Sequence, residues 1–80
     1  MNNECKALNE AAEKIRSKAL RIAVLDVVET ARVNADDTVR DGDASPDDWG
    51  WLFLGSIQTQ LAFCESARVR AWFATRGINF

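Results

Sequence analysis

The sequence predicts an all-α fold, a two-helix antiparallel hairpin that assembles into an oligomeric helical bundle. Residues 4–34 contain neither Gly nor Pro and are rich in residues that favour helices. A clear helix start follows at residues 45–48, Ser-Pro-Asp-Asp. Both predicted helices carry apolar residues on several sides, which is typical of helices with several neighbours. We expect one domain over residues 1–80, with a helix over 4–34, an acidic turn over 35–45 and a helix over 46–76.

The length and composition favour oligomerisation as the support for this small fold. A chain of 80 residues buries a modest core, and such chains usually gain stability from disulfides, a metal or association. There is no His and there are only two Cys, so we expect no metal and no cofactor. Cys5 and Cys64 lie far apart in the sequence, and we interpret them as small buried apolar residues in a reducing cytoplasm.

The predicted helix over residues 4–34 has two apolar stripes. The first recurs at steps of three and four residues through Leu8, Ala12, Ile15, Ala19 and Ile22. The second consists of Leu20, Val24, Val27, Val28 and Ala31. Asp26 lies on the first stripe, where an ionic partner across a protomer interface would explain it. The two stripes therefore predict two neighbours for this helix.

The connection over residues 35–45 is predicted to be a solvated acidic turn. Asp41-Gly42-Asp43 is typical of a turn. A calcium loop of the EF-hand type requires Gly at its sixth position, but the sixth residue from Asp41 is Pro46. The negative charge is instead well placed beside the N-terminus of the next helix.

The boundaries of the helix over residues 46–76 follow from capping residues. Ser45 is expected to be the N-cap, and Pro46 fits the first helical position because its missing N–H is not needed there. Gly77 is a suitable C-cap, and Ile78 is expected to fold back onto the helix as the apolar contact beyond it.

Apolar residues surround this second helix. The side expected to pack on the first helix carries Phe53, Leu54, Ile57, Leu61, Cys64, Ala71 and Trp72. A second side carries Trp49, Leu52, Phe63, Ala67 and Ala74, and the remaining side carries Trp51, Val69 and Phe73. Gly50 and Gly55 each weaken the helix by about 1 kcal/mol relative to Ala. Close approach of another backbone or of a ligand would compensate for them.

Arg68 is the most unusual residue because it falls on the predicted apolar side of the second helix. A buried cation needs an anionic partner. One interpretation is a salt bridge to Glu10 or Glu13 of the first helix. The other is that Arg68, together with Arg70, binds a phosphate or carboxylate of a ligand, because the planar guanidinium suits such groups.

Trp51 and Gln60 are further candidates for ligand binding. Most aromatic residues here fit a core or interface role, but Trp51 lies on an otherwise polar side and could stack on a nucleobase. Gln60 could hydrogen-bond a base edge. Without His, Tyr or a metal cluster, general acid–base catalysis has few candidate groups, so we expect no enzyme activity.

The second helix resembles that of small phage proteins that counter cyclic-oligonucleotide immune signalling, the anti-CBASS and Thoeris-countering cyclic-nucleotide sponges. The resemblance rests on Pro46-Asp47, Trp51-Leu52, Gly55, Gln60, Phe63 and Arg68, and more weakly on Leu8-Asn9-Glu10. It covers mainly residues 46–70, and the preceding turn is longer and more acidic here. It implies a helical hairpin whose homo-oligomer sequesters cyclic di- or trinucleotides between protomers without hydrolysing them, with Arg68 on a phosphate.

Two binding functions are therefore predicted, beside a third interpretation as a helical dimer with a structural role. The first is a cytoplasmic phage anti-defence sponge with a ligand site formed by Arg68, Arg70, Gln60 and Trp51. The alternative is a small acidic protein–protein inhibitor of the anti-CRISPR or transcription-antagonist type, whose partner is a host immune protein or another protein with a nucleic-acid groove. Its contacts would be Asp41, Asp43, Asp47, Asp48 and Trp49. A net charge of −2 and the lack of a long apolar run predict neither direct DNA binding nor a membrane span.

Overall fold

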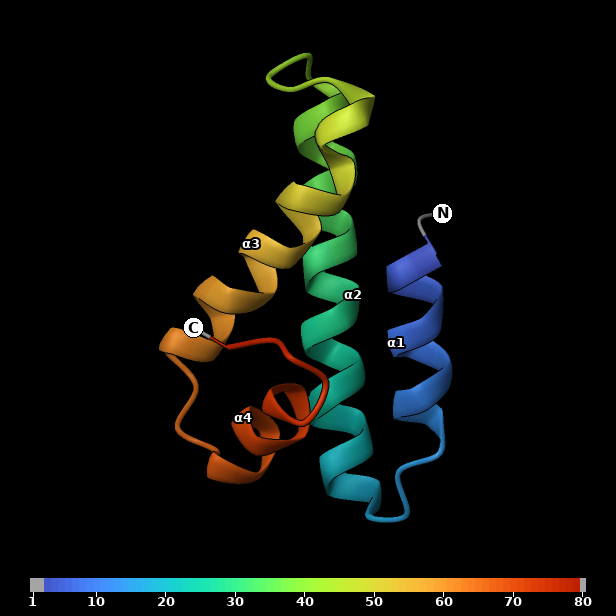
Figure 1. Ribbon diagram of the computed structural model, residues 1–80, viewed down its shortest axis with the longest axis vertical. Coiled ribbons are helices and arrows are strands. Elements are labelled where there is room, and N and C mark those ends of the chain that lie inside the picture. The colour runs from blue at the N-terminus through green and yellow to red at the C-terminus, as the bar shows by residue number, and fades with distance from the viewer. Residues whose placement is uncertain (1–2, 80) are drawn as a thin grey trace.

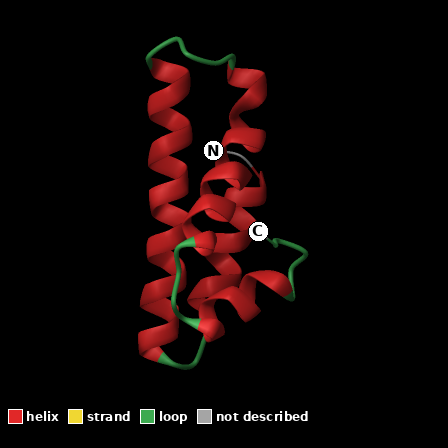
Figure 2. Cartoon of the chain, turned by 90° about the vertical axis from the view of Figure 1, so that its left-hand side faces the viewer, coloured by secondary structure: helices red, strands yellow, loops and turns green. Residues whose placement is uncertain are grey.

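The computed structural model describes residues 3–79 and contains helices joined by loops, with no strand in that range (Figures 1 and 2). The all-α class is thereby confirmed. The elements are α1 (Asn3–Glu13), α2 (Lys18–Arg40), the 3₁₀ turn η1 (Pro46–Asp48), α3 (Trp49–Ala62) and α4 (Ala67–Ala74). Within residues 3–79, no helix combines the length and the apolar character needed to cross a lipid bilayer.

Helix α2 is the centre of the arrangement, and the other helices pack around it. Figure 1 shows α1 and α3 on different sides of α2, each running against its direction, with α4 beside the lower part of α2. The core lies between these helices. Its buried residues are Cys5, Leu8, Ala12, Val24, Val28, Ala31, Ala35, Phe53, Ile57, Leu61, Val69 and Phe73.

The predicted helix over residues 4–34 is interrupted at residues 14–17, which is the first correction. Ser17 caps α2 by accepting a hydrogen bond from the backbone N–H of Leu20 at 3.2 Å. The guanidinium of Arg21 donates to the carbonyl of Ile15 at 2.9 Å and holds the reversal of the chain. Helix α1 therefore folds back onto α2. Helix α2 thus has two neighbours, α1 and α3, within the same chain.

This interruption changes which side of the first helical region is buried. Leu8 and Ala12 belong to the core, but the same predicted stripe does not continue into α2, where Ile22 is 56% exposed. The buried side of α2 instead follows the second stripe through Val24 and Val28. Asp26 is exposed in the single chain, and its predicted partner across a protomer interface stays a prediction.

Helix α2 extends to Arg40, so the connection is shorter than the predicted turn over residues 35–45. Gly42 ends the helix with a left-handed φ of 79°. The N–H of Asp43 bonds to the carbonyl of Thr38 at 3.1 Å, and that of Gly42 bonds to Val39 at 3.1 Å, which is a Schellman ending. The turn residues are those predicted from the sequence, but the helix ends later than predicted.

The predicted helix over residues 46–76 is also interrupted, at residues 63–66. Ser66 starts α4 by accepting a hydrogen bond from the N–H of Val69 at 3.3 Å. Because the helical phase restarts there, Val69 and Phe73 enter the core, whereas Arg68 is exposed. The predicted apolar side was therefore wrong beyond Ala62.

Both predicted caps of this region are confirmed. The Ser45 hydroxyl accepts from the N–H of Asp47 at 3.3 Å, with Pro46 at the first position of η1. At the other end Gly77 has a φ of 78°, and the N–H of Ile78 bonds to the carbonyl of Phe73 at 3.0 Å. Ile78 packs against the core, as expected for the apolar residue after a Schellman ending.

Candidate functional site

The four predicted ligand residues have different surroundings. Trp51 is 81% exposed, in agreement with its predicted position on α3. The side-chain amide of Gln60 donates to the carbonyl of Val27 at 3.0 Å and so ties α3 to α2. The guanidinium of Arg70 donates to the carbonyl of Cys64 in the loop before α4. Gln60 and Arg70 therefore have structural hydrogen bonds within the chain.

Arg68 does not occupy an apolar side of a helix, so that expectation is wrong. It is exposed near the start of α4, where the guanidinium is solvated. Within residues 3–79 no ion pair joins it to Glu10 or Glu13, so the proposed internal salt bridge is absent from this range. Because Arg68 is exposed, its charge does not need a buried anionic partner.

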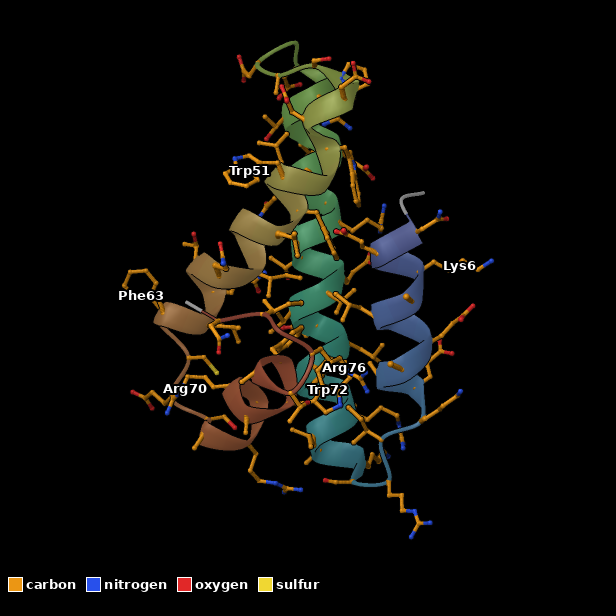
Figure 3. The ribbon with its side chains drawn as sticks, viewed as in Figure 1. Lys6, Trp51, Phe63, Arg70, Trp72 and Arg76 are labelled. Carbon is orange, nitrogen blue, oxygen red and sulfur yellow. The ribbon has the colours of Figure 1, made fainter. Side chains whose placement is uncertain are left out.

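A single chain does not gather the predicted ligand residues into one site. Figure 3 shows Trp51 towards the end of α3 near η1, whereas Arg70 lies beyond the other end of α3. The two side chains are separated by most of the length of that helix. Binding by both would require a second protomer.

The predicted partner-binding aspartates form a coherent surface. We define the acidic end as Asp41, Asp43, Asp47 and Asp48, which lie between the end of α2 and the start of α3 and are all exposed. Arg40 pairs with Asp37 at 2.7 Å and reaches Asp41 at 3.8 Å. Across residues 3–79, no ion pair involves the other three aspartates of the acidic end. Negative charge is therefore concentrated there with little compensation.

Trp49 has a different role from the predicted partner contact. It is half-buried, and its indole Nε1–H donates to Asp36 Oδ1 at 2.6 Å. Its ring stacks on that of Phe53, with centroids 5.1 Å apart and planes 14° apart. Trp49 therefore anchors the start of α3 against α2, and Trp51 is the aromatic residue that projects into solvent.

The exposed side of α3 is the surface that the sequence analysis described least well. Phe63, the C-cap residue that follows α3, is 84% exposed. Trp51 and Phe63 both project away from α2 in Figure 3. We call this side the α3 outer face and define it by Trp51, Gly55, Thr59 and Phe63. No charged side chain occurs from Trp49 to Cys64.

A shallow hollow borders the α3 outer face where α3 meets α2. It measures about 310 Å³ and is lined by Asn34, Thr38, Leu52, Gly55, Ser56, Thr59 and Gln60. The lining mixes apolar surface with uncharged polar groups, and the amide of Asn34 donates to the Ser56 hydroxyl at 2.9 Å. The hollow offers hydrogen-bonding groups and no charge for catalysis.

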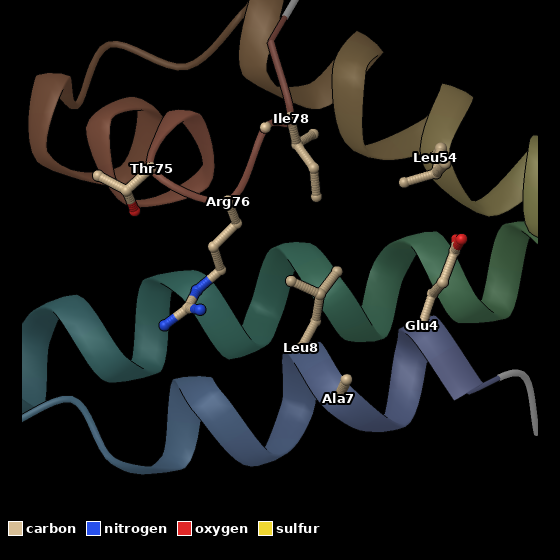
Figure 4. Close-up of a pocket in the computed structure, with 8 residues that line it drawn as sticks. Glu4, Ala7, Leu8, Leu54, Thr75, Arg76 and Ile78 are labelled. Atoms are coloured by element: carbon tan, nitrogen blue, oxygen red, sulfur yellow. The ribbon is translucent and has the colours of Figure 1, made fainter.

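A larger cleft, of about 550 Å³, lies between α1, α3 and the C-terminal turn (Figure 4). Leu8, Leu54 and Ile78 supply its apolar lining, and Arg76 and Glu4 also border it. The Arg76 guanidinium lies over the Trp72 ring at 4.4 Å from its centroid. None of the predicted ligand residues lines this cleft.

Titratable groups with perturbed pKa values lie on α1 and α2. Burial raises the pKa of the Cys5 thiol above its ordinary value. The hydrogen bond from Arg32 lowers the pKa of the Glu29 carboxyl. Cys5 and Cys64 are both free thiols. Within residues 3–79, no cluster of three or more His, Cys, Asp or Glu side chains could hold a metal ion.

No protein-family model matches the chain, and no curated protein sequence or solved structure matches it significantly. The resemblance to cyclic-nucleotide sponges therefore stays a prediction based on residues 46–70. The acidic end and the α3 outer face are therefore the features from which function is inferred.

Proposed function

We propose that this protein is a non-enzymatic binding protein whose acidic end docks on a basic surface of another protein. The observation that carries the proposal is the exposed set of four aspartates in one short connection. The neighbouring carboxylates repel one another, and a cationic partner would offset this repulsion and attract all of them. Trp51, exposed close by on α3, supplies an aromatic contact beside the charge.

The expected partner is a protein surface that otherwise binds nucleic acid. Such surfaces carry clustered Lys and Arg arranged to meet phosphates. Carboxylates at several positions of a compact connection offer acceptors to the same cations. The protein would act as an inhibitor by occupying the nucleic-acid groove, which is the mode expected for an antagonist of host defence or of transcription.

The test is a comparison of two triple variants that remove equal charge. The first carries Asp43→Asn, Asp47→Asn and Asp48→Asn in the acidic end. The control carries Glu10→Gln, Glu13→Gln and Asp26→Asn, three exposed positions elsewhere. Affinity capture from a bacterial extract, followed by mass spectrometry, measures which nucleic-acid-binding proteins each variant retains.

We expect the wild type and the control to retain the same basic partner, and high salt or added heparin to displace it. The acidic-end variant should lose that partner while circular dichroism shows that it keeps its helices. Equal capture by both variants would contradict the proposal.

A second candidate function is sequestration of a cyclic di- or trinucleotide by a homo-oligomer. The exposure of both Trp51 and Arg68 favours it, because both are free to stack on or pair with a ligand at a protomer boundary. Native mass spectrometry with cyclic di- and trinucleotides tests this. Added ligand mass should be lost in Trp51→Ala and Arg68→Ala and kept in Arg16→Ala, an exposed control. The absence of added mass in the wild type would contradict this function.

A further inference from the structure

Gly55 has no explanation within this chain. It lies inside α3, where glycine is less favourable than alanine. Its φ is not in the left-handed region, unlike those of Gly42 and Gly77. A Cβ atom built on Gly55 meets nothing within 4 Å. Neither the backbone nor the packing within residues 3–79 requires glycine there, and close approach of a second backbone from outside the chain would give it a role.

The sequence around Gly55 forms a regular pattern on the α3 outer face. Trp51, Gly55, Thr59 and Phe63 follow one another at steps of four residues, which form a ridge along a helix. The ridge is large at both ends and small in the middle. The two aromatic ends are 81% and 84% exposed. They lie about 18 Å apart along the helix axis.

We infer that the α3 outer face binds a second copy of this chain, with the two α3 helices crossing antiparallel at Gly55 and Thr59. Helices whose four-step ridges interdigitate cross at about −50° and come closest at the crossing point. Small residues there allow close approach of the backbones. The aromatic residues at the ends fill the space where the helices diverge.

A second copy fits because the ridge is complementary to itself under a two-fold rotation. The rotation pairs Trp51 of one copy with Phe63 of the other, and Gly55 with Thr59. It also sends the two acidic ends to opposite ends of the dimer, so that their charges stay apart. A parallel arrangement would place both acidic ends together.

The size of the exposed ridge predicts a dimer that dissociates on dilution. The two aromatic side chains bring roughly 300 Å² per copy, given the area that such residues usually bury. A standard interface buries about 800 Å² per partner. The neighbouring hollow, which Gly55 and Thr59 line, supplies part of the remainder.

Sedimentation velocity of the full chain over a range of concentrations tests the inference. The wild type should pass from monomer to dimer. Gly55→Leu should weaken association at least about tenfold, because a side chain then separates the backbones. Its fold should remain intact, since the space at Gly55 is open within the chain. Ala19→Leu, which adds a leucine to an exposed position of α2, should leave association unchanged.

A charge pair distinguishes a second copy from another kind of partner. Thr59→Asp should dissociate the dimer, because it places two carboxylates in an uncharged interface, one on each side of the two-fold axis. Mixing Thr59→Asp with Thr59→Lys should restore a heterodimer. A wild type that stays monomeric at millimolar concentration, or equal association of Gly55→Leu and wild type, would overturn the inference. Neither result tests the four aspartates of the acidic end, which lie outside the proposed interface. Trp51 is the one residue that both proposals use.

Discussion

The exposed sides of α2 and α3 differ in how they meet solvent. On α2, Arg32 pairs with Glu29 and, at 2.8 Å, with Asp36, and Arg40 pairs with Asp37 at 2.7 Å. On α3 no charged residue occurs, and two aromatic side chains project outward. Both helices bury one side in the same core. The exposed side of α2 therefore combines ion pairs with the partly exposed Ile22 and Val33, whereas the uncharged side of α3 carries the more exposed Trp51 and is followed by the equally exposed Phe63, which is typical of an interface.

The largest expected effect comes from comparing two phenylalanine-to-alanine substitutions, one on the buried side of α3 and one at the exposed residue that follows it. Phe53 is fully buried, and Phe53→Ala should lower the free energy of unfolding by about 3–5 kcal/mol. That is a large part of the roughly 4–12 kcal/mol expected for a chain of this length. Phe63→Ala should change it by less than about 0.5 kcal/mol, because Phe63 is exposed. Urea unfolding measures both, and similar losses would remove the distinction between the two sides.

An intermediate effect is expected at Ser66, the N-cap of α4, and it tests whether the helix is interrupted at residues 63–66. Ser66→Ala removes the cap of α4 and should lower the free energy of unfolding by about 1 kcal/mol. Ser66→Asp keeps an acceptor at the N-cap and should retain wild-type stability. If Ser66→Ala matched the wild type, a continuous helix through residues 63–66 would become the better description.

Stability is expected to depend on pH through Cys5, which is buried in the core. The positive charge of Arg32 partly opposes the effect of burial on this thiol. Burial raises the pKa of this thiol in the folded state. The folded protein therefore keeps the proton after the unfolded chain has lost it, and stability falls as pH rises above the pKa of an ordinary thiol. Urea unfolding at increasing pH should show this fall in the wild type and a smaller one in Cys5→Ala. Equal pH dependence of the two proteins would show that Cys5 is not its source.

The smallest effect concerns the charged side of α2. A double-mutant cycle with Glu29→Gln and Arg32→Gln should give a coupling that is small beside the loss in Ser66→Ala and that decreases with added salt. Because the hydrogen bond from Arg32 lowers the Glu29 pKa, this contribution is present above the ordinary pKa of a glutamate and is lost as pH falls through the lower folded value. A coupling unchanged by salt would contradict a solvated ion pair.

Sequence reasoning succeeded where the signal is local. Ser45, Pro46, Gly77 and Ile78 act as predicted, because capping depends on a few adjacent residues. The breaks at residues 14–17 and 63–66 were missed, although Ser17 and Ser66 are suitable N-caps. Each break competes with a continued helix of similar local preference, and packing onto α2 decides the outcome.

The candidate site residues also divide into those whose positions follow from local sequence and those whose positions depend on packing. The exposure of Trp51 could be predicted, because α3 keeps one helical phase from Trp49 to Ala62. The exposure of Arg68 could not, because its phase is set by Ser66 after the break. The grouping of the aspartates followed from sequence alone, since they lie within one short connection. The role of Trp49 as an anchor required knowledge of Asp36 as its neighbour.

The most direct test of α3 as an interface is ¹⁹F NMR of the chain labelled with fluorotryptophan. Three signals are expected, from Trp49, Trp51 and Trp72. The signal that disappears in Trp51→Phe is assigned to Trp51. We predict that the Trp51 signal shifts or broadens as the protein concentration rises from micromolar to millimolar, while the half-buried Trp49 and Trp72 signals stay in place. A Trp51 signal that is constant over this range would contradict the claim that the α3 outer face is built for contact with a second copy.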